Sequence, residues 1–189
     1  MTNTSAHPPA VRWPFVDLWD TAQTYDRFQE GAALEHRGLW ESIHHLAKVP
    51  AWAMEQAATL PAGVRLVALS EDWCGDAVNT LPIVAKWAEA AHISLRILKR
   101  DEHPAVMDRY LTGGTARAIP VVIALAGDWQ ELGWWGPRPS VLQAWVREQR
   151  ALGREKADLY PEIRRWYARD RGESTLREIL SLFSLKVLS

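Results

Sequence analysis

The chain has 189 residues, of which 48% are hydrophobic, so it can bury the core of one elaborated domain. Its formal net charge of −1 gives no electrostatic reason to expect a nucleic acid or an anionic membrane as a partner. Cys74 is the only cysteine, which excludes a disulfide within the chain and suits a reducing compartment.

The first 61 residues are predicted to form helices that precede a sheet. Residues 1–14 are rich in proline, and apolar residues recur at three-to-four spacing over residues 17–60, which indicates two or three helices. The N-terminus lacks the basic and apolar segments of a signal peptide. No apolar run reaches the roughly 18 residues that a membrane span needs. We therefore expect a cytoplasmic protein without a membrane partner.

Three histidines, His36, His44 and His45, lie in this helical region. Their spacing is poor for a metal site, because adjacent residues diverge on a helix and no carboxylate or thiol has motif spacing to them. We therefore expect no metal.

The middle of the chain alternates between strands and helices. The predicted strands are residues 64–69, 93–98, 120–126 and 129–135. A helix from about Asp76 to Ala91 joins the first two strands, and a crossover of this length implies that they are parallel. Gly127 and Asp128 form a tight turn, so the last strand is expected to run antiparallel to the third.

Helices are predicted for the remainder of the chain. One covers Ser140–Leu152, and two more follow it, with Pro161 in the first turn of one of them. A capping box from Thr175 to Glu178 predicts the start of the last helix, whose broad apolar surface extends to Val187. That surface packs into the core or forms a dimer contact.

Cys74 lies where the first strand ends and the next helix begins. At such a position unpaired N–H groups and the positive end of the helix dipole stabilise a thiolate, so the pKa can fall from about 8.5 to between roughly 3.5 and 7.5. Asp76 opposes ionisation by its like charge, but we expect its carboxylate to turn toward water. The prediction is an accessible Cys74 thiol with a pKa below that of a free thiol.

Several short motifs resemble those of the thioredoxin family. They are Trp73-Cys74-Gly75, Pro82, Asp101-Glu-His-Pro104, Arg117-Ala-Ile-Pro120 and Gly136. The first matches the start of the family's Trp-Cys-Gly-Pro-Cys motif. The others match, in order, the proline that kinks its first active-site helix, an Asp-x-x-Pro, an Arg-Gly-Ile-Pro and a late glycine. The longer form, Trp-Cys-Gly-Asp-Ala, resembles a bacterial branch of the family.

The resemblance implies a thioredoxin-like α/β fold, in which helices flank a central mixed sheet and helical extensions lie at both ends. The single domain, 1–189, then consists of an N-terminal helical extension (1–61), a thioredoxin core (62–152) and C-terminal helices (153–189). The resemblance also implies a cis peptide bond between Ile119 and Pro120, with Pro120 facing Cys74.

Three positions depart from the family pattern. Ala77 replaces the second cysteine, Asp76 replaces the usual proline, and Ala68 stands where thioredoxins have a buried aspartate that accepts protons. The resolving thiol and the internal base are therefore both missing, and a dithiol cycle within one chain is impossible.

Two functions remain open. In the first, the chain is a monothiol thiol–disulfide oxidoreductase, in which Cys74 is catalytic and an external thiol, such as a low-molecular-weight one, resolves the mixed disulfide. In the second, it is a catalytically inactive binding module that holds an extended peptide or a partner protein. The residues expected to contact the substrate are Trp73, Gly75, Asp76, Ala118, Ile119 and Pro120. The expected partner is a disulfide-containing or thiolated protein or small molecule, without a resident cofactor, and the chain is a monomer or homodimer.

Overall fold

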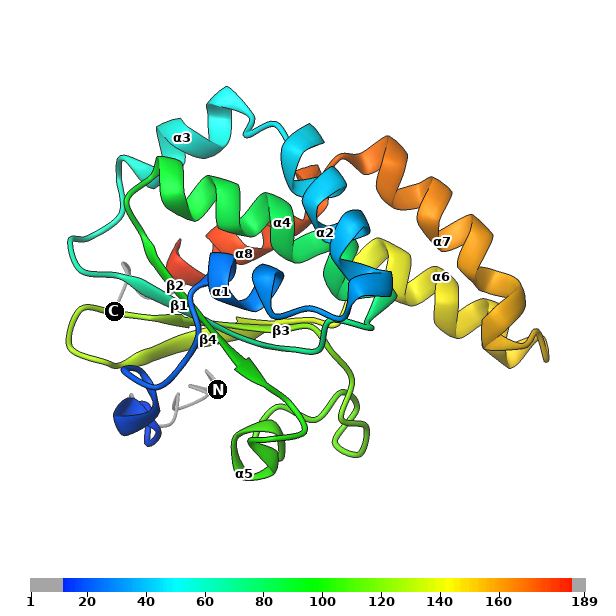
Figure 1. Ribbon diagram of the computed structural model, residues 1–189, viewed down its shortest axis with the longest axis horizontal. Helices are drawn as coiled ribbons and strands as arrows, with labels where there is room; N and C mark the ends of the chain where they lie inside the picture. Colours follow the sequence, from blue (N-terminus) through cyan, green and yellow to red (C-terminus); the bar gives the residue numbers. More distant parts are fainter. Residues whose placement is uncertain (1–11, 185–189) are drawn as a thin grey trace, which may run out of the picture.

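The structure, a computed structural model, describes residues 12–184 (Figure 1). Most of the proline-rich segment and the end of the predicted last helix, including Val187, lie outside the described residues. Within residues 12–184, no helix is long and apolar enough to cross a membrane.

A four-stranded mixed sheet forms the centre of the fold. Its strands are β1 (Arg65–Ser70), β2 (Ser94–Lys99), β3 (Val121–Leu125) and β4 (Glu131–Trp135), in the order β2-β1-β3-β4. β1 and β2 are parallel, whereas β3 runs antiparallel to both β1 and β4. The predicted α/β fold class is confirmed.

The burial of the two central strands, β1 and β3, accounts for the apolar runs in the sequence. All of β3 and all of β1 after Arg65 are buried, and a strand that is covered on both faces needs apolar residues throughout. β4 lies at the edge of the sheet, and most of its residues are only partly buried.

Helices cover both faces of the sheet. The α-helices are α1 (Tyr25–Glu30), α2 (Leu34–Leu46), α3 (Ala51–Ala57), α4 (Gly75–Ala90), α5 (Pro104–Met107), α6 (Ser140–Ala151), α7 (Lys156–Asp170) and α8 (Glu173–Ser184), and a short 3-10 helix, η1 (Val16–Leu18), precedes them. Figure 1 shows α2, α3, α4 and α8 on one side of the sheet, with α5 and the segment around η1 on the other. α4 carries the expected Pro82 inside it and is buried over most of its length.

The three C-terminal helices divide between two clusters of buried residues. α8 packs against β3 and β4, so its apolar face is part of the main core. The second cluster joins α6 to α7 and consists of Leu142, Val146, Leu159, Ile163 and Tyr167. The second cluster therefore contains residues from both sides of residue 152. In Figure 1, α6 and α7 form an antiparallel pair beyond one end of the sheet.

Two predicted helix starts are wrong. α7 begins five residues before Pro161, which therefore lies inside the helix rather than in its first turn. α8 begins two residues before Thr175, the predicted capping residue. The Asp170 carboxylate accepts the N–H of Ser174 at 3.2 Å, so an acid from the preceding helix supplies the hydrogen bond that Thr175 was expected to give.

Candidate functional site

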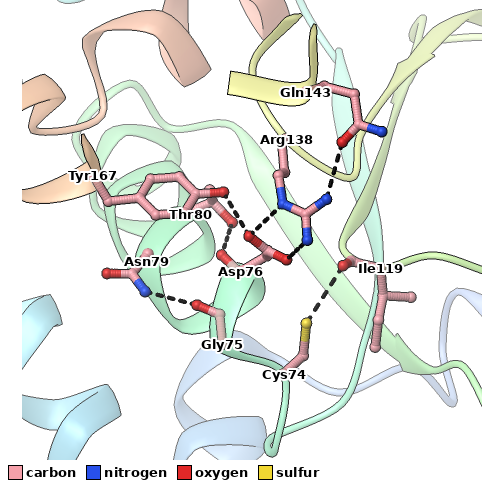
Figure 2. A network of polar contacts seen from close by, with 9 residues as sticks. All are labelled: Cys74, Gly75, Asp76, Asn79, Thr80, Ile119, Arg138, Gln143 and Tyr167. Carbon is pink, nitrogen blue, oxygen red and sulfur yellow. Dashed lines mark hydrogen bonds and ion pairs between the residues drawn. The ribbon is translucent and has the colours of Figure 1, made fainter. Parts of the chain in front are cut away.

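Cys74 lies at the junction of β1 and α4 and is the N-cap residue of α4. Its backbone is extended, with φ −78° and ψ 113°, and its carbonyl accepts the N–H of Val78 at 3.0 Å. The residue is only 8% exposed. Its thiol donates a hydrogen bond to the carbonyl oxygen of Ile119, with an Sγ–O distance of 3.4 Å (Figure 2).

The N-terminal helices hold the loop that leads to Cys74. Trp40 of α2 is fully buried, and its indole Nε1 donates to the Asp72 carbonyl at 2.8 Å. The Asp72 carboxylate accepts the N–H of Ala33, the N-cap residue of α2, at 2.7 Å. The N-terminal extension therefore fixes the turn from which α4 begins.

The segment opposite the thiol contains a cis peptide bond between Ile119 and Pro120, the geometry that the resemblance implied. Gly136, after β4, approaches this segment closely. Its φ is +140°, and a Cβ at this position would lie 2.1 Å from the carbonyl oxygen of Pro120. Only glycine allows both the backbone conformation and the approach.

Asp76, in the first turn of α4, forms a buried ion pair with Arg138 (Figure 2). Arg138 donates from Nε to Oδ1 at 2.8 Å and from Nη2 to Oδ2 at 2.5 Å, so the guanidinium binds both carboxylate oxygens. The Tyr167 hydroxyl donates to Oδ1 at 3.1 Å, and Arg138 Nη1 donates to the side-chain oxygen of Gln143 at 3.0 Å. Asp76 is 6% exposed. The network joins α4 to the turn after β4, to α6 and to α7.

The prediction of an accessible thiol with a low pKa is wrong. Burial raises the pKa of Cys74, and the Asp76 carboxylate raises it further. The backbone N–H groups of Ala77 and Asp76 and the charge of Arg138 lower this pKa, but burial is the larger effect. The prediction failed because it assumed an exposed thiol and placed the Asp76 carboxylate in water, whereas the structure places that carboxylate in a buried ion pair.

A family model described as thioredoxin matches residues 22–153, well over half of the chain. The chain belongs to the thioredoxin family. Its fold also resembles that of two solved structures. One is a protein of unknown function from Pseudomonas aeruginosa, with a TM-score of 0.72, 18% identity, and 90% of this chain and 96% of the other covered. The second is an HIV epitope scaffold, with a TM-score of 0.69, 18% identity, and coverage of 90% and 97%. At this identity both likenesses concern the fold alone, and no curated protein matches significantly.

Two departures from the thioredoxin motif lie inside the protein. Ala77, in the first turn of α4, and Ala68, in β1, are both fully buried. An alanine methyl group therefore occupies each place where the resemblance puts the second thiol and the internal acid. Since Cys74 is the only cysteine, any resolving thiol has to come from outside the chain.

The other expected contact residues differ in their exposure. Trp73 is 51% exposed, and the Arg100 guanidinium lies 5.0 Å from its ring centroid. Gly75 and Ala118 are half-buried, and Ile119 and Pro120 are buried next to the thiol. The structure therefore brings Trp73 and the Ile119–Pro120 segment together at Cys74, whereas the Asp76 carboxylate is occupied by its own partners.

Three residues of the network are not evident from the sequence, namely Arg138, Gln143 and Tyr167. The sequence signal for Arg138 is its place between two prolines in the turn after β4. In the structure, this turn brings the Arg138 cation to the Asp76 carboxylate in the first turn of α4. Tyr167 has the spacing of an ordinary buried helical position, and Gln143 has no distinguishing pattern.

The described residues contain no group of three or more His, Cys, Asp or Glu side chains that could hold a metal ion. The groups that the site offers for chemistry are the Cys74 thiol, the helix N-terminus and the buried ion pair.

Proposed function

We propose that Cys74 is the single reacting thiol of a thiol–disulfide exchange protein. The position of its sulfur carries the proposal: it lies at the N-cap of α4, 3.4 Å from the Ile119 carbonyl and beside the cis bond before Pro120. The N–H groups of the helix N-terminus lower the free energy of a thiolate at this position, although burial opposes its formation in the resting protein.

The reaction proceeds in two exchanges. Cys74 releases its proton to solvent, and its thiolate attacks one sulfur of a disulfide R–S–S–R′. The Cys74–S–S–R bond forms, the S–S bond of the substrate breaks, and R′–S⁻ leaves with the electron pair. An external thiolate R″–S⁻ then attacks the mixed disulfide, which releases R–S–S–R″ and returns the Cys74 thiolate. A low-molecular-weight thiol in a reducing cytoplasm would serve as R″–SH.

The residues around the sulfur have separate roles in this proposal. The backbone of Ala118, Ile119 and Pro120 aligns an extended substrate segment beside Cys74. Trp73 supplies an exposed aromatic face at the edge of the site. The substrate is a disulfide-containing or thiolated protein or small molecule.

The burial of Cys74 favours a second candidate, a thioredoxin-fold binding module without catalysis. A thiol that is 8% exposed and whose pKa is raised by burial stays protonated and shielded at neutral pH. In that case the Ile119–Pro120 segment would hold an extended peptide or partner protein without forming a covalent bond.

Because the chain has one cysteine, a direct test separates the two candidates. The folded protein is mixed with an aromatic disulfide such as 5,5′-dithiobis(2-nitrobenzoate), release of the coloured thiolate is followed, and glutathione is then added. We expect one equivalent to be released, a mixed disulfide in the intact mass, and recovery of free Cys74 after glutathione. Cys74→Ser is the control, and the chain unfolded in urea gives the rate of a fully accessible thiol. If the unfolded chain reacts but the folded protein does not, the binding module is the correct function.

A further inference from the structure

We propose that the buried Asp76–Arg138 pair controls the ionisation of Cys74, with Asp76 restraining the thiolate, Arg138 favouring it, and Gln143 linking α6 to this control. Asp76 and Arg138 are positioning residues in this proposal, because they act through the sulfur and not on the substrate. The inference rests on the proposed function only in that the Cys74 thiolate is the reacting species.

Figure 2 shows Asp76 and Arg138 beside Cys74, and the ion pair holds both charges in place. Asp76 follows Cys74 by two residues in the same first turn of α4, and both are buried. Arg138 binds the two carboxylate oxygens and Tyr167 binds one of them, so the carboxylate cannot turn toward water without breaking three hydrogen bonds. The Arg138 side chain is itself 9% exposed.

The charge balance gives the direction of each effect. While Cys74 is protonated, the site holds one negative and one positive charge. Ionisation of Cys74 adds a second negative charge near a single guanidinium, in surroundings where charges interact more strongly than in water. Without the Asp76 charge, the thiolate would instead neutralise Arg138.

Among the described residues, Asp76 and Arg138 are the charged side chains that act on Cys74. On α7 the group that faces the pair is Tyr167, a neutral phenol whose own pKa is raised by burial and by Asp76. On α6 it is the neutral amide of Gln143, and the neighbouring segment contributes the Ile119 carbonyl. The Asp76 carboxylate accordingly raises the pKa of Cys74, and the Arg138 guanidinium lowers it.

The test is the pH dependence of Cys74 alkylation by iodoacetamide in the folded protein, measured for three variants. Asp76→Asn keeps the shape of the side chain and removes its charge, so we expect the midpoint to move down by about one pH unit or more, and labelling below the midpoint to speed up about tenfold. Gln143→Glu brings a second carboxylate to Arg138 and is expected to move the midpoint up by about half a unit.

Gln149→Glu is the matched control for the second variant. Gln149 is also on α6, is partly buried and accepts a hydrogen bond from an arginine, Arg154, at 2.9 Å, but it is six residues farther along the helix than Gln143. Its substitution is expected to leave the midpoint unchanged. Gln143→Glu also keeps the test usable if Asp76→Asn does not fold.

The inference is overturned if Asp76→Asn folds without lowering the midpoint, or if Gln143→Glu and Gln149→Glu give the same midpoint. If the network only shields the sulfur, Asp76→Asn will raise the plateau rate of alkylation and leave the midpoint unchanged. That result also overturns the inference. Exchange with the aromatic disulfide is measured in parallel. Shifted alkylation midpoints without exchange would leave the inference standing and refute the proposed function, whereas exchange with unmoved midpoints would do the reverse.

Discussion

Tyr167→Phe tests whether the hydroxyl of Tyr167 ties α7 to the first turn of α4. This hydroxyl donates to Asp76 Oδ1 at 3.1 Å, and both residues are buried. Phenylalanine fills nearly the same space but cannot donate. A hydrogen bond to a charged group contributes about 1.5–3 kcal/mol to stability. Because Asp76 keeps both hydrogen bonds from Arg138 in the variant, we expect a loss at the lower end, about 1.5 kcal/mol in the free energy of unfolding.

Urea denaturation followed by tryptophan fluorescence measures this loss, which is expected to lower the transition midpoint without changing the m-value. Tyr160→Phe is the control on the same helix. Within the part of the chain that the structure describes, the Tyr160 hydroxyl has no hydrogen bond, so its removal is expected to change stability by less than about 0.5 kcal/mol. Equal losses in the two variants, or no loss in Tyr167→Phe, would refute the reasoning.

Three further results are expected. Gly136→Ala is expected to lower the free energy of unfolding in urea by at least about 3 kcal/mol, because its Cβ would lie 2.1 Å from the Pro120 carbonyl oxygen. Gly114→Ala, at φ +77° with open space around it, is the control and is expected to cost about 1 kcal/mol. Similar losses in the two variants would contradict the close approach. Ala77→Cys places a second thiol one helical turn from Cys74 and reduces insulin disulfides faster than Ala77→Ser; equal rates would show that the missing acid or Asp76 limits reduction. Because burial raises the pKa of Cys74, the free energy of unfolding, compared with that of Cys74→Ser, is expected to fall as pH rises above about 8.5. The fall is at most about 1.4 kcal/mol per pH unit and ends where the pH reaches the folded-state pKa. A difference between the two proteins that does not change with pH would contradict the raised pKa.

The sheet could be predicted because its signals are local. The apolar runs of β1 and β3 correspond to strands that are buried on both faces, and the Gly127–Asp128 turn indicates the antiparallel return of β4. The packing of the C-terminal helices could not be read in the same way. Apolar spacing identifies a buried face, but it does not say that α8 lies on the sheet while α6 and α7 pack on each other.

Only the parts of the site that lie within short sequence motifs could be predicted. The apolar pattern of the sequence places Cys74 at a helix N-terminus, and the resemblance to thioredoxins implies that Pro120 faces it. The partners of Asp76 are 62 and 91 residues away in the chain, and no periodicity connects them to it. The pKa prediction failed for the same reason, because the solvation of a carboxylate near a helix start depends on what packs over that turn.

Asp76 and the α6–α7 pair form a single structural feature. A carboxylate buried in the first turn of α4 is costly unless it is paired and its remaining oxygen sites are hydrogen-bonded. Arg138 supplies the charge, and it is held in turn by Gln143 of α6, while Tyr167 of α7 completes the hydrogen bonds of the carboxylate. The proline that the thioredoxin motif has at this position needs none of these partners. The replacement of proline by Asp76 therefore depends on the helices that follow β4, and those helices depend on Asp76 for a buried polar contact with the core. Through Gln143 and Tyr167, the α6–α7 pair is thus joined to the turn of α4 that follows Cys74.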